Sequence, residues 1–167
     1  MKYLTEYLHC GDGLKESFSV ELDEIFNVIS SLQWQSHFTV TDKGKKYDHQ
    51  RAYNRAFNNA FKELGWEVQP KLRDKPRLIG DFRKGHVFGE IQFGNSSTLY
   101  RDFYKFQYGV QNGLLSLGVL IVPTAPAAFF PTRPRSVHNM AEFDLATRYF
   151  TILPISVPTL IIGLEPK

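Results

Sequence analysis

Apolar and polar residues recur along this chain with two different periods, and each period predicts one kind of element. Ser19 is placed to cap a helix, and apolar residues then recur at spacings of three and four, at Leu22, Ile25, Phe26, Ile29 and Leu32. A stronger helical pattern runs from about Asp48 to Leu64, and Gly65 follows it as a capping glycine would. Both segments are therefore predicted to be helices with one apolar face.

The rest of the pattern predicts a sheet and two further helices. Strands are expected over Lys2 to Cys10, Trp66 to Val68, Leu115 to Val122 and Thr159 to Leu164. The third of these is almost continuously apolar, as in a strand covered on both faces. Helices are expected after the turn at Gly94 to Ser97 and over Met140 to Phe150. Loops are expected over Lys43 to Lys46, Pro70 to Pro76 and Pro123 to Pro134.

In the helix that follows Gly94 to Ser97, the apolar stripe separates an inner from an outer face. Leu99, Phe103, Phe106 and Val110 follow the helical repeat and are predicted to pack inward. Arg101, Lys105 and Tyr108 are then expected to stay outside.

A β-hairpin is predicted in the middle of the chain. Two strand-like runs, Arg77 to Phe82 and His86 to Phe93, flank Arg83-Lys84-Gly85, and Asp81 ends the first run. Side chains alternate between the two faces of a strand, so Glu90 and Gln92 are expected on one face with His86 and Phe88. If the hairpin twists normally, the Asp81 carboxylate can approach that of Glu90.

Two carboxylates held together repel each other, and a hard divalent cation is the usual resolution. The alternative is a polar hairpin face in water, because a chain with 17 Asp and Glu residues contains such spacings by chance. Near this site, Glu24 can lean toward the metal or only complement the dipole of its own helix, and Asn58 is a candidate for orienting metal-bound water.

Length and composition indicate a single globular domain over residues 1–167. The chain is 43% hydrophobic, which is enough for one core, and its charge is near the globular average, which excludes wholesale disorder. The single cysteine, Cys10, cannot form an internal disulfide, and neither a signal peptide nor a membrane-length apolar run is evident. A cytoplasmic protein with no membrane partner is expected.

The net charge of +3 permits a polyanionic partner without requiring one. Hydrogen-bond donors gather late in the chain, and their side chains can reach phosphates or base edges; they are Arg133, Arg135, Ser136, His138 and Asn139. Contacts to a phosphate backbone are assigned to Lys43, Lys45, Lys46, Arg73 and Lys84. For His138, an ordinary surface residue is the alternative.

The order of elements, with an Asp-ended strand and a Glu-x-Gln strand, resembles the PD-(D/E)XK nuclease core. Gly89-Glu90-Ile91-Gln92-Phe93-Gly94 is similar to the active-site strand of the BglII and BstYI restriction endonucleases, in which Gln replaces the usual Lys. Glu24-Ile25, Leu64-Gly65-Trp66 and the closing stretch from Val157 to Leu164 extend the resemblance over most of the chain. Gly80 stands where the pattern has proline before the Asp, although that proline is often missing in such enzymes.

The resemblance implies an α/β fold with a central mixed β-sheet flanked by helices. It also implies a type II restriction endonuclease that hydrolyses double-stranded DNA with Mg²⁺ and leaves 5′-phosphate and 3′-hydroxyl ends. Asp81, Glu90 and the Ile91 backbone carbonyl would bind the metal, and Gln92 would orient the attacking water. A symmetric homodimer, a short palindrome containing GATC and a cognate DNA methyltransferase follow by the same analogy.

Three other functions are compatible with these residues. A repair or junction-resolving nuclease of the same core would share Asp81 and Glu90 but prefer DNA structure over sequence. A catalytically inactive DNA-binding module would bind duplexes without cutting them. An interaction domain would show no DNA affinity that falls with added salt.

Overall fold

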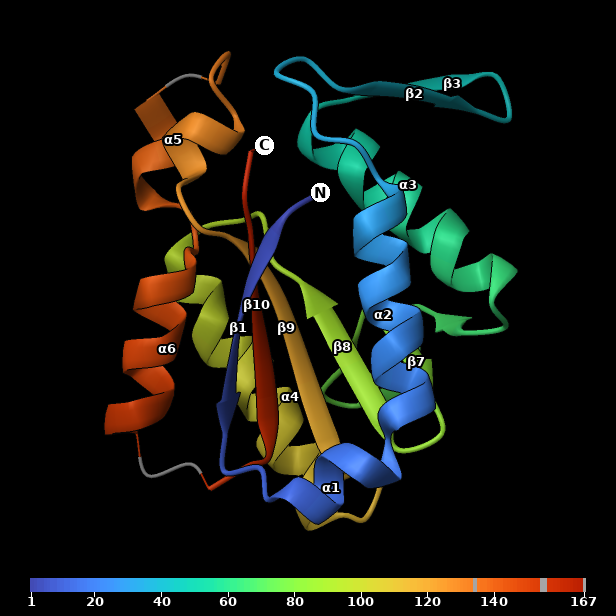
Figure 1. Ribbon diagram of the computed structural model, residues 1–167, viewed down its shortest axis with the longest axis vertical. Coiled ribbons are helices and arrows are strands. Elements are labelled where there is room, and N and C mark those ends of the chain that lie inside the picture. Colours follow the sequence, from blue (N-terminus) through green and yellow to red (C-terminus); the bar gives the residue numbers. More distant parts are fainter. Residues whose placement is uncertain (134, 154–155, 167) are drawn as a thin grey trace.

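A six-stranded mixed sheet forms the centre of the computed structural model, which describes residues 1–133, 135–153 and 156–166. The strand order is β1-β10-β9-β8-β7-β4 (Figure 1). These strands are β1 (Tyr3–Leu8), β4 (Glu67–Val68), β7 (Phe82–Lys84), β8 (Val87–Ile91), β9 (Leu117–Pro123) and β10 (Thr159–Leu164). Strands β8, β9 and β10 run parallel, and the other neighbours pair antiparallel.

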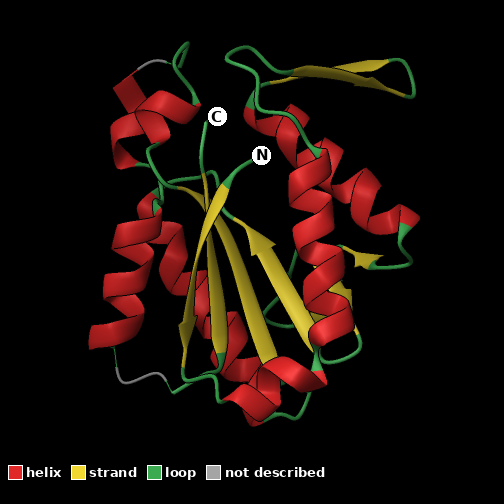
Figure 2. Cartoon of the chain, viewed as in Figure 1, coloured by secondary structure: helices red, strands yellow, loops and turns green. Residues whose placement is uncertain are grey.

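Helices cover both faces of the sheet (Figure 2). They are α1 (Asp12–Ser17), α2 (Ser19–Ser31), α3 (Gln50–Glu63), α4 (Leu99–Gln111), α5 (Pro126–Phe129) and α6 (Phe143–Ile152), with 3₁₀ turns η1 (Ser96–Thr98) and η2 (Arg135–Asn139). Parallel neighbours need a crossover, and α4 connects β8 to β9 while α6 connects β9 to β10. The predicted α/β class with a mixed sheet is confirmed.

The core is divided by the sheet into two clusters of buried side chains. One cluster joins α2 and α3 to the sheet through residues such as Ile25, Phe57 and Val87. The other joins α4 and α6 to the opposite face through Phe106 and Phe150. All seven residues of β9 are buried, as its continuous apolar run predicts, because helices cover it on both sides.

Two short hairpins lie outside the central sheet. One consists of β2 (Thr39–Asp42) and β3 (Lys45–Asp48), and the other of β5 (Lys71–Arg73) and β6 (Leu78–Ile79). The predicted loop at Lys43 to Lys46 is therefore the turn and second strand of a hairpin, in which Gly44 has a φ of 76°. The predicted loop at Pro123 to Pro134 contains α5.

The predicted β-hairpin is present, with a shift in its turn. Strand β7 begins at Phe82, so Asp81 precedes the strand instead of ending it. Lys84 pairs with Val87, which places the turn at Gly85 and His86.

None of the helices in the three described ranges is long and apolar enough to cross a membrane.

Candidate active site

Backbone and side-chain hydrogen bonds place Asp81 beside strand β8. The Asp81 N–H donates to the Gly89 carbonyl at 3.0 Å, and the Ile91 N–H donates to Asp81 Oδ2 at 2.7 Å. Since Phe82 is the register partner of Gly89, Asp81, the residue just before β7, comes opposite Glu90. The predicted approach of the two carboxyl residues is therefore present.

Two glycines allow this close crossing. An ideal Cβ built on Gly80 would lie 2.2 Å from the Phe88 ring, and one built on Gly89 would lie 2.0 Å from the Phe82 ring. Each ring thus occupies the space that a side chain would need. This explains why glycine stands directly before Asp81 and directly before Glu90.

Glu90 faces helix α4 and is paired there with a lysine. Its exposed fraction is only 5%, and Lys105 Nζ donates to its Oε1 at 2.5 Å. The same ammonium lies 2.9 Å from Asp102 Oδ1, one turn earlier in α4. That second contact is an ion pair without hydrogen-bond geometry, and it leaves accepting capacity on Asp102 Oδ1 unused.

Gln92 joins the same cluster from the end of the active-site strand. Its Nε2 donates to Asp102 Oδ2 at 2.6 Å, and its Oε1 accepts from the Gly94 N–H at 2.9 Å. Both ends of the amide are thereby held. The side chains of Asp81, Glu90, Gln92, Asp102 and Lys105 consequently form one polar cluster beneath the start of α4, which we call the carboxylate cluster.

The carboxylate cluster carries more negative than positive charge. Burial, followed by the charges of Asp102 and Asp81, raises the pKa of Glu90 well above its ordinary value, although Lys105 acts in the opposite sense. Burial also raises the pKa of Asp81, against the effect of the Ile91 N–H. Burial alone would lower the pKa of Lys105, but Glu90 and Asp102 outweigh it and the pKa is raised.

Its donor chemistry fits a hard divalent cation. In the described part of the chain, no three His, Cys, Asp or Glu side chains are arranged to hold a metal by themselves. Mg²⁺ keeps several waters and needs only one or two protein carboxylates, so Asp81 and Glu90 with a backbone carbonyl are sufficient. Three carboxylates against one ammonium also leave negative charge for a cation to neutralise.

The two supporting residues predicted from the sequence lie elsewhere. Glu24 does not lean toward the carboxylate cluster, because its carboxylate accepts from Trp66 Nε1 at 2.6 Å and from Lys84 Nζ at 2.7 Å. Asn58 lines an open cavity of about 660 Å³ on α3, together with Arg55 and Lys62. Neither position supports a role at the metal, and Lys84 is occupied by its ion pair with Glu24.

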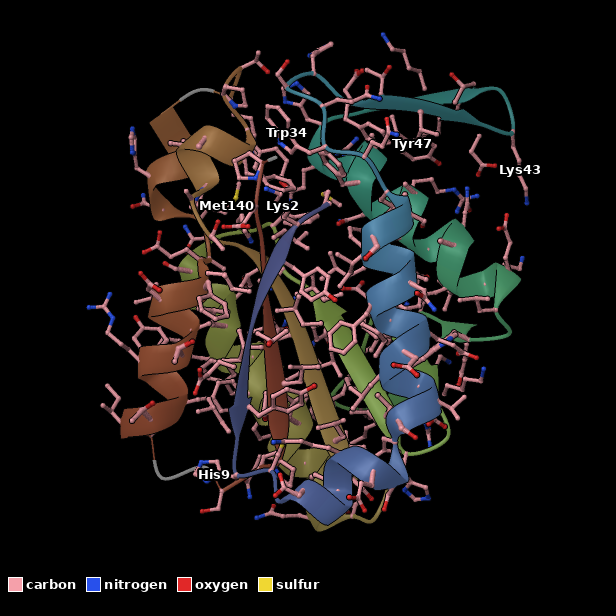
Figure 3. The ribbon with its side chains drawn as sticks, in the orientation of Figure 1. Lys2, His9, Trp34, Lys43, Tyr47 and Met140 are labelled. Carbon is pink, nitrogen blue, oxygen red and sulfur yellow. The ribbon has the colours of Figure 1, made fainter. Side chains whose placement is uncertain are left out.

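The predicted DNA contacts are distributed over three surfaces. Lys43, Lys45 and Lys46 are exposed on the β2–β3 hairpin, and Lys43 stands at its tip, away from the rest of the protein (Figure 3). Arg73 donates to the hydroxyl of Tyr108 at 3.2 Å and remains exposed.

Arg133 comes from the segment after α5 and reaches the start of α3, where its Nη1 donates to Gln50 Oε1 at 2.6 Å. It lines a pocket of about 330 Å³ with Lys46 and Arg51. His138 and Asn139 are exposed on η2, whereas the side chains of Arg135 and Ser136 lie outside the described part. This surface joins two segments that are far apart in the sequence.

A family model described as Restriction endonuclease BglII/BglIII matches residues 3–164. The chain belongs to the BglII family of restriction endonucleases. It is therefore a deoxyribonuclease, and the predicted resemblance is confirmed. A search among curated protein sequences finds no significant match.

Two solved structures share its fold. The crystal structure of restriction endonuclease BglII complexed with a DNA 16-mer matches with a TM-score of 0.76 and 14% identity, covering 100% of this chain and 78% of that one. The crystal structure of free BglII matches with a TM-score of 0.66 and 16% identity, covering 98% and 79%.

Sequence reasoning missed the contribution of α4. Lys105 was expected on the outer face, but its side chain is only 3% exposed, and Asp102 is fully buried. The signal lay in the pairing of Asp102 and Lys105 at a spacing of three residues, opposite a strand that carries Glu90 and Gln92. Helical periodicity marks only the apolar stripe, and so it cannot show that a charged pair is buried against an acidic strand.

Proposed function

We propose that this protein is a type II restriction endonuclease that cleaves double-stranded DNA in an Mg²⁺-dependent reaction. The observation that carries the proposal is the pairing of Asp81 with Glu90 across the hairpin, in a cluster with excess negative charge. Membership of the BglII family and the fold shared with a nuclease that was crystallised on DNA support the same chemistry.

Asp81, Glu90 and the Ile91 carbonyl would hold the metal. When bound, Mg²⁺ lowers the pKa of water and neutralises charge that develops on the phosphate. Asp81 is oriented for this role by the Ile91 N–H, and Glu90 by Lys105. Hydrolysis with in-line attack on phosphorus would leave 5′-phosphate and 3′-hydroxyl ends.

Gln92 would act by hydrogen bonding, since an amide can neither carry a charge nor accept a proton as a base does at neutral pH. Nε2 has a second hydrogen besides the one given to Asp102, and that hydrogen can orient the attacking water. The bonds to Asp102 and Gly94 hold the amide in place for this purpose.

DNA would contact the basic surface formed by Lys46, Arg51 and Arg133, where the described pocket of about 330 Å³ lies. We propose a symmetric homodimer, in which each protomer cuts one strand of a palindromic site. We also propose that this site contains GATC and that a cognate DNA methyltransferase acts on it. Arg133→Ala is expected to relax preference at one position of the site if the side chain reads a base. A phosphate contact would instead weaken binding uniformly and reduce its salt dependence.

The deciding experiment is incubation of the protein with a sequenced plasmid, with and without Mg²⁺, beside an Asp81→Ala, Glu90→Ala double variant. Discrete, metal-dependent fragments that vanish with the double variant are expected, and sequencing their ends gives the site. A smear would favour a structure-selective or non-specific nuclease. Intact plasmid under every condition would contradict the proposal.

A further inference from the structure

A small basic pocket of about 230 Å³ opens beside the carboxylate cluster. It is lined by Arg77, Ile79, Arg101 and Lys105. Three of these four side chains are cationic, although the net charge of the whole chain is only +3. The pocket therefore concentrates positive charge directly next to an acidic site.

Lys105 belongs to both places. Its buried ammonium contacts Glu90 Oε1 and Asp102 Oδ1, and its side chain also lines the basic pocket. Arg77 and Arg101 are exposed at the surface, and the charge of Arg101 reaches Asp81, whose pKa it acts to lower. The basic pocket and the carboxylate cluster are therefore parts of one site with an acidic and a basic side.

The basic side of this site can offset the negative charge of a substrate phosphate. A phosphodiester brings a negative charge to carboxylates that are already in excess, and Gln92 at the end of the strand carries no positive charge. Planar guanidinium groups bind phosphate oxygens in pairs, and a lysine ammonium acts as a point charge. The residues that line the basic pocket provide both kinds of group.

We propose that the basic pocket holds the phosphate that is cleaved, with Arg77 and Arg101 binding its oxygens and Lys105 supplying the positive charge that Gln92 lacks. Asp102 acts as a positioning residue, because it contacts both Lys105 and Gln92. The proposal rests on the nuclease function proposed above and assigns the substrate phosphate to named residues outside the hairpin.

The first test compares cleavage rates of Arg77→Gln, Arg101→Gln and Lys105→Met under single-turnover conditions with saturating protein and Mg²⁺. Each Arg variant is expected to slow cleavage about 10-fold. Lys105→Met is expected to slow it about 100-fold, the effect of removing one preorganised donor to developing negative charge. Arg148→Gln is the matched control, because Arg148 is an exposed arginine on α6 that lines a different pocket. Its rate should equal that of the wild type.

The second test does not depend on cleavage. Inorganic phosphate with Mg²⁺ should raise the melting temperature of the wild type and of Arg148→Gln, because a ligand that binds only the folded state stabilises it. Arg77→Gln and Arg101→Gln should lose this increase. If the wild type cuts no DNA but shows this pattern, the nuclease proposal fails while the phosphate site stands.

The inference would be overturned if both Arg variants cut DNA at the wild-type rate. It would also be overturned if phosphate did not raise the melting temperature of the wild type, or if it still raised that of the two Arg variants. Because Lys105→Met removes a buried charge and can unfold the protein, Lys105→Arg provides the second variant. It keeps the charge and is expected to cut faster than Lys105→Met. The two Arg substitutions lie at exposed positions, so their outcome stands independently of folding.

Discussion

The replacement of Lys105 by Met makes the sharpest test of the carboxylate cluster as a unit. Lys105 and Glu90 have side chains that are 3% and 6% exposed, and their charged atoms are 2.5 Å apart. Removing the ammonium leaves the Glu90 and Asp102 carboxylates buried without their cation. Breaking a buried ion pair from one side typically costs about 3–5 kcal/mol.

The expected loss is large for a domain of this size. Total unfolding free energies are about 5–15 kcal/mol, and 1 kcal/mol shifts the melting temperature by about 2–4 °C in a domain of 150–250 residues. Lys105→Met should therefore melt about 6–20 °C below the wild type at neutral pH in the absence of metal. Differential scanning calorimetry measures this directly.

The mechanism predicts two rescues. Glu90→Gln combined with Lys105→Met should recover about half of the loss, because a neutral amide costs less to bury than an unpaired carboxylate, while Asp102 still lacks its partner. Lowering the pH toward 5 should also reduce the defect, since burial raises the pKa of Glu90 and its carboxylate can then take up a proton. Melting of Lys105→Met within about 2 °C of the wild type at neutral pH would refute the reasoning.

Three further predictions follow from the site. Gln92→Ala should slow cleavage while leaving DNA binding nearly intact, and unchanged cleavage would show that its amide has no part in catalysis. Gly89→Ala should lower the unfolding free energy by about 1–3 kcal/mol in urea, because its methyl group would overlap the Phe82 ring, whereas Gly13→Ala, with open space around it, should not destabilise the protein. Finally, burial raises the pKa of Glu90 in the folded state above its unfolded pKa of 4.5. The contribution of Glu90 to the unfolding free energy is therefore fully present below pH 4.5 and is lost as the pH rises through the folded pKa. The metal-free protein should thus lose stability from pH 5 to 8 in calorimetry, and Mg²⁺ should bind more tightly as the pH rises; the opposite slope would contradict the acidic cluster.

Much of the fold could be predicted because burial imposes a period on the sequence. The strand over Thr159 to Leu164, the buried strand near Leu115 to Val122 and the helix near Asp48 to Leu64 all occur close to their predicted limits. Alternation along the active-site strand also holds, since Val87 and Phe88 belong to core clusters on opposite faces of the sheet. Local hydrophobic patterns were sufficient where each element buries one clear face.

Short elements were harder to predict because they depend on packing. The α1 and α5 helices have six and four residues, too few to show a periodic stripe. The β2–β3 hairpin was interpreted as a basic loop because its lysines dominate the composition there. Glu24 was considered for the metal site, but its partner was set by the tertiary position of Trp66, 42 residues later.

The sequence by itself determined the family, the class of fold and the Asp81 and Glu90 pair, because these depend on local order and on one short motif. Only the tertiary structure decided which side chains complete the site. Helix α4 crosses from β8 to β9 over the face that carries Glu90, and this crossover brings a charged Asp102–Lys105 pair into the interior. A cation expected in solvent is buried there because it pairs with both Glu90 and Asp102, and their combined charge at one point is a property of the folded chain alone.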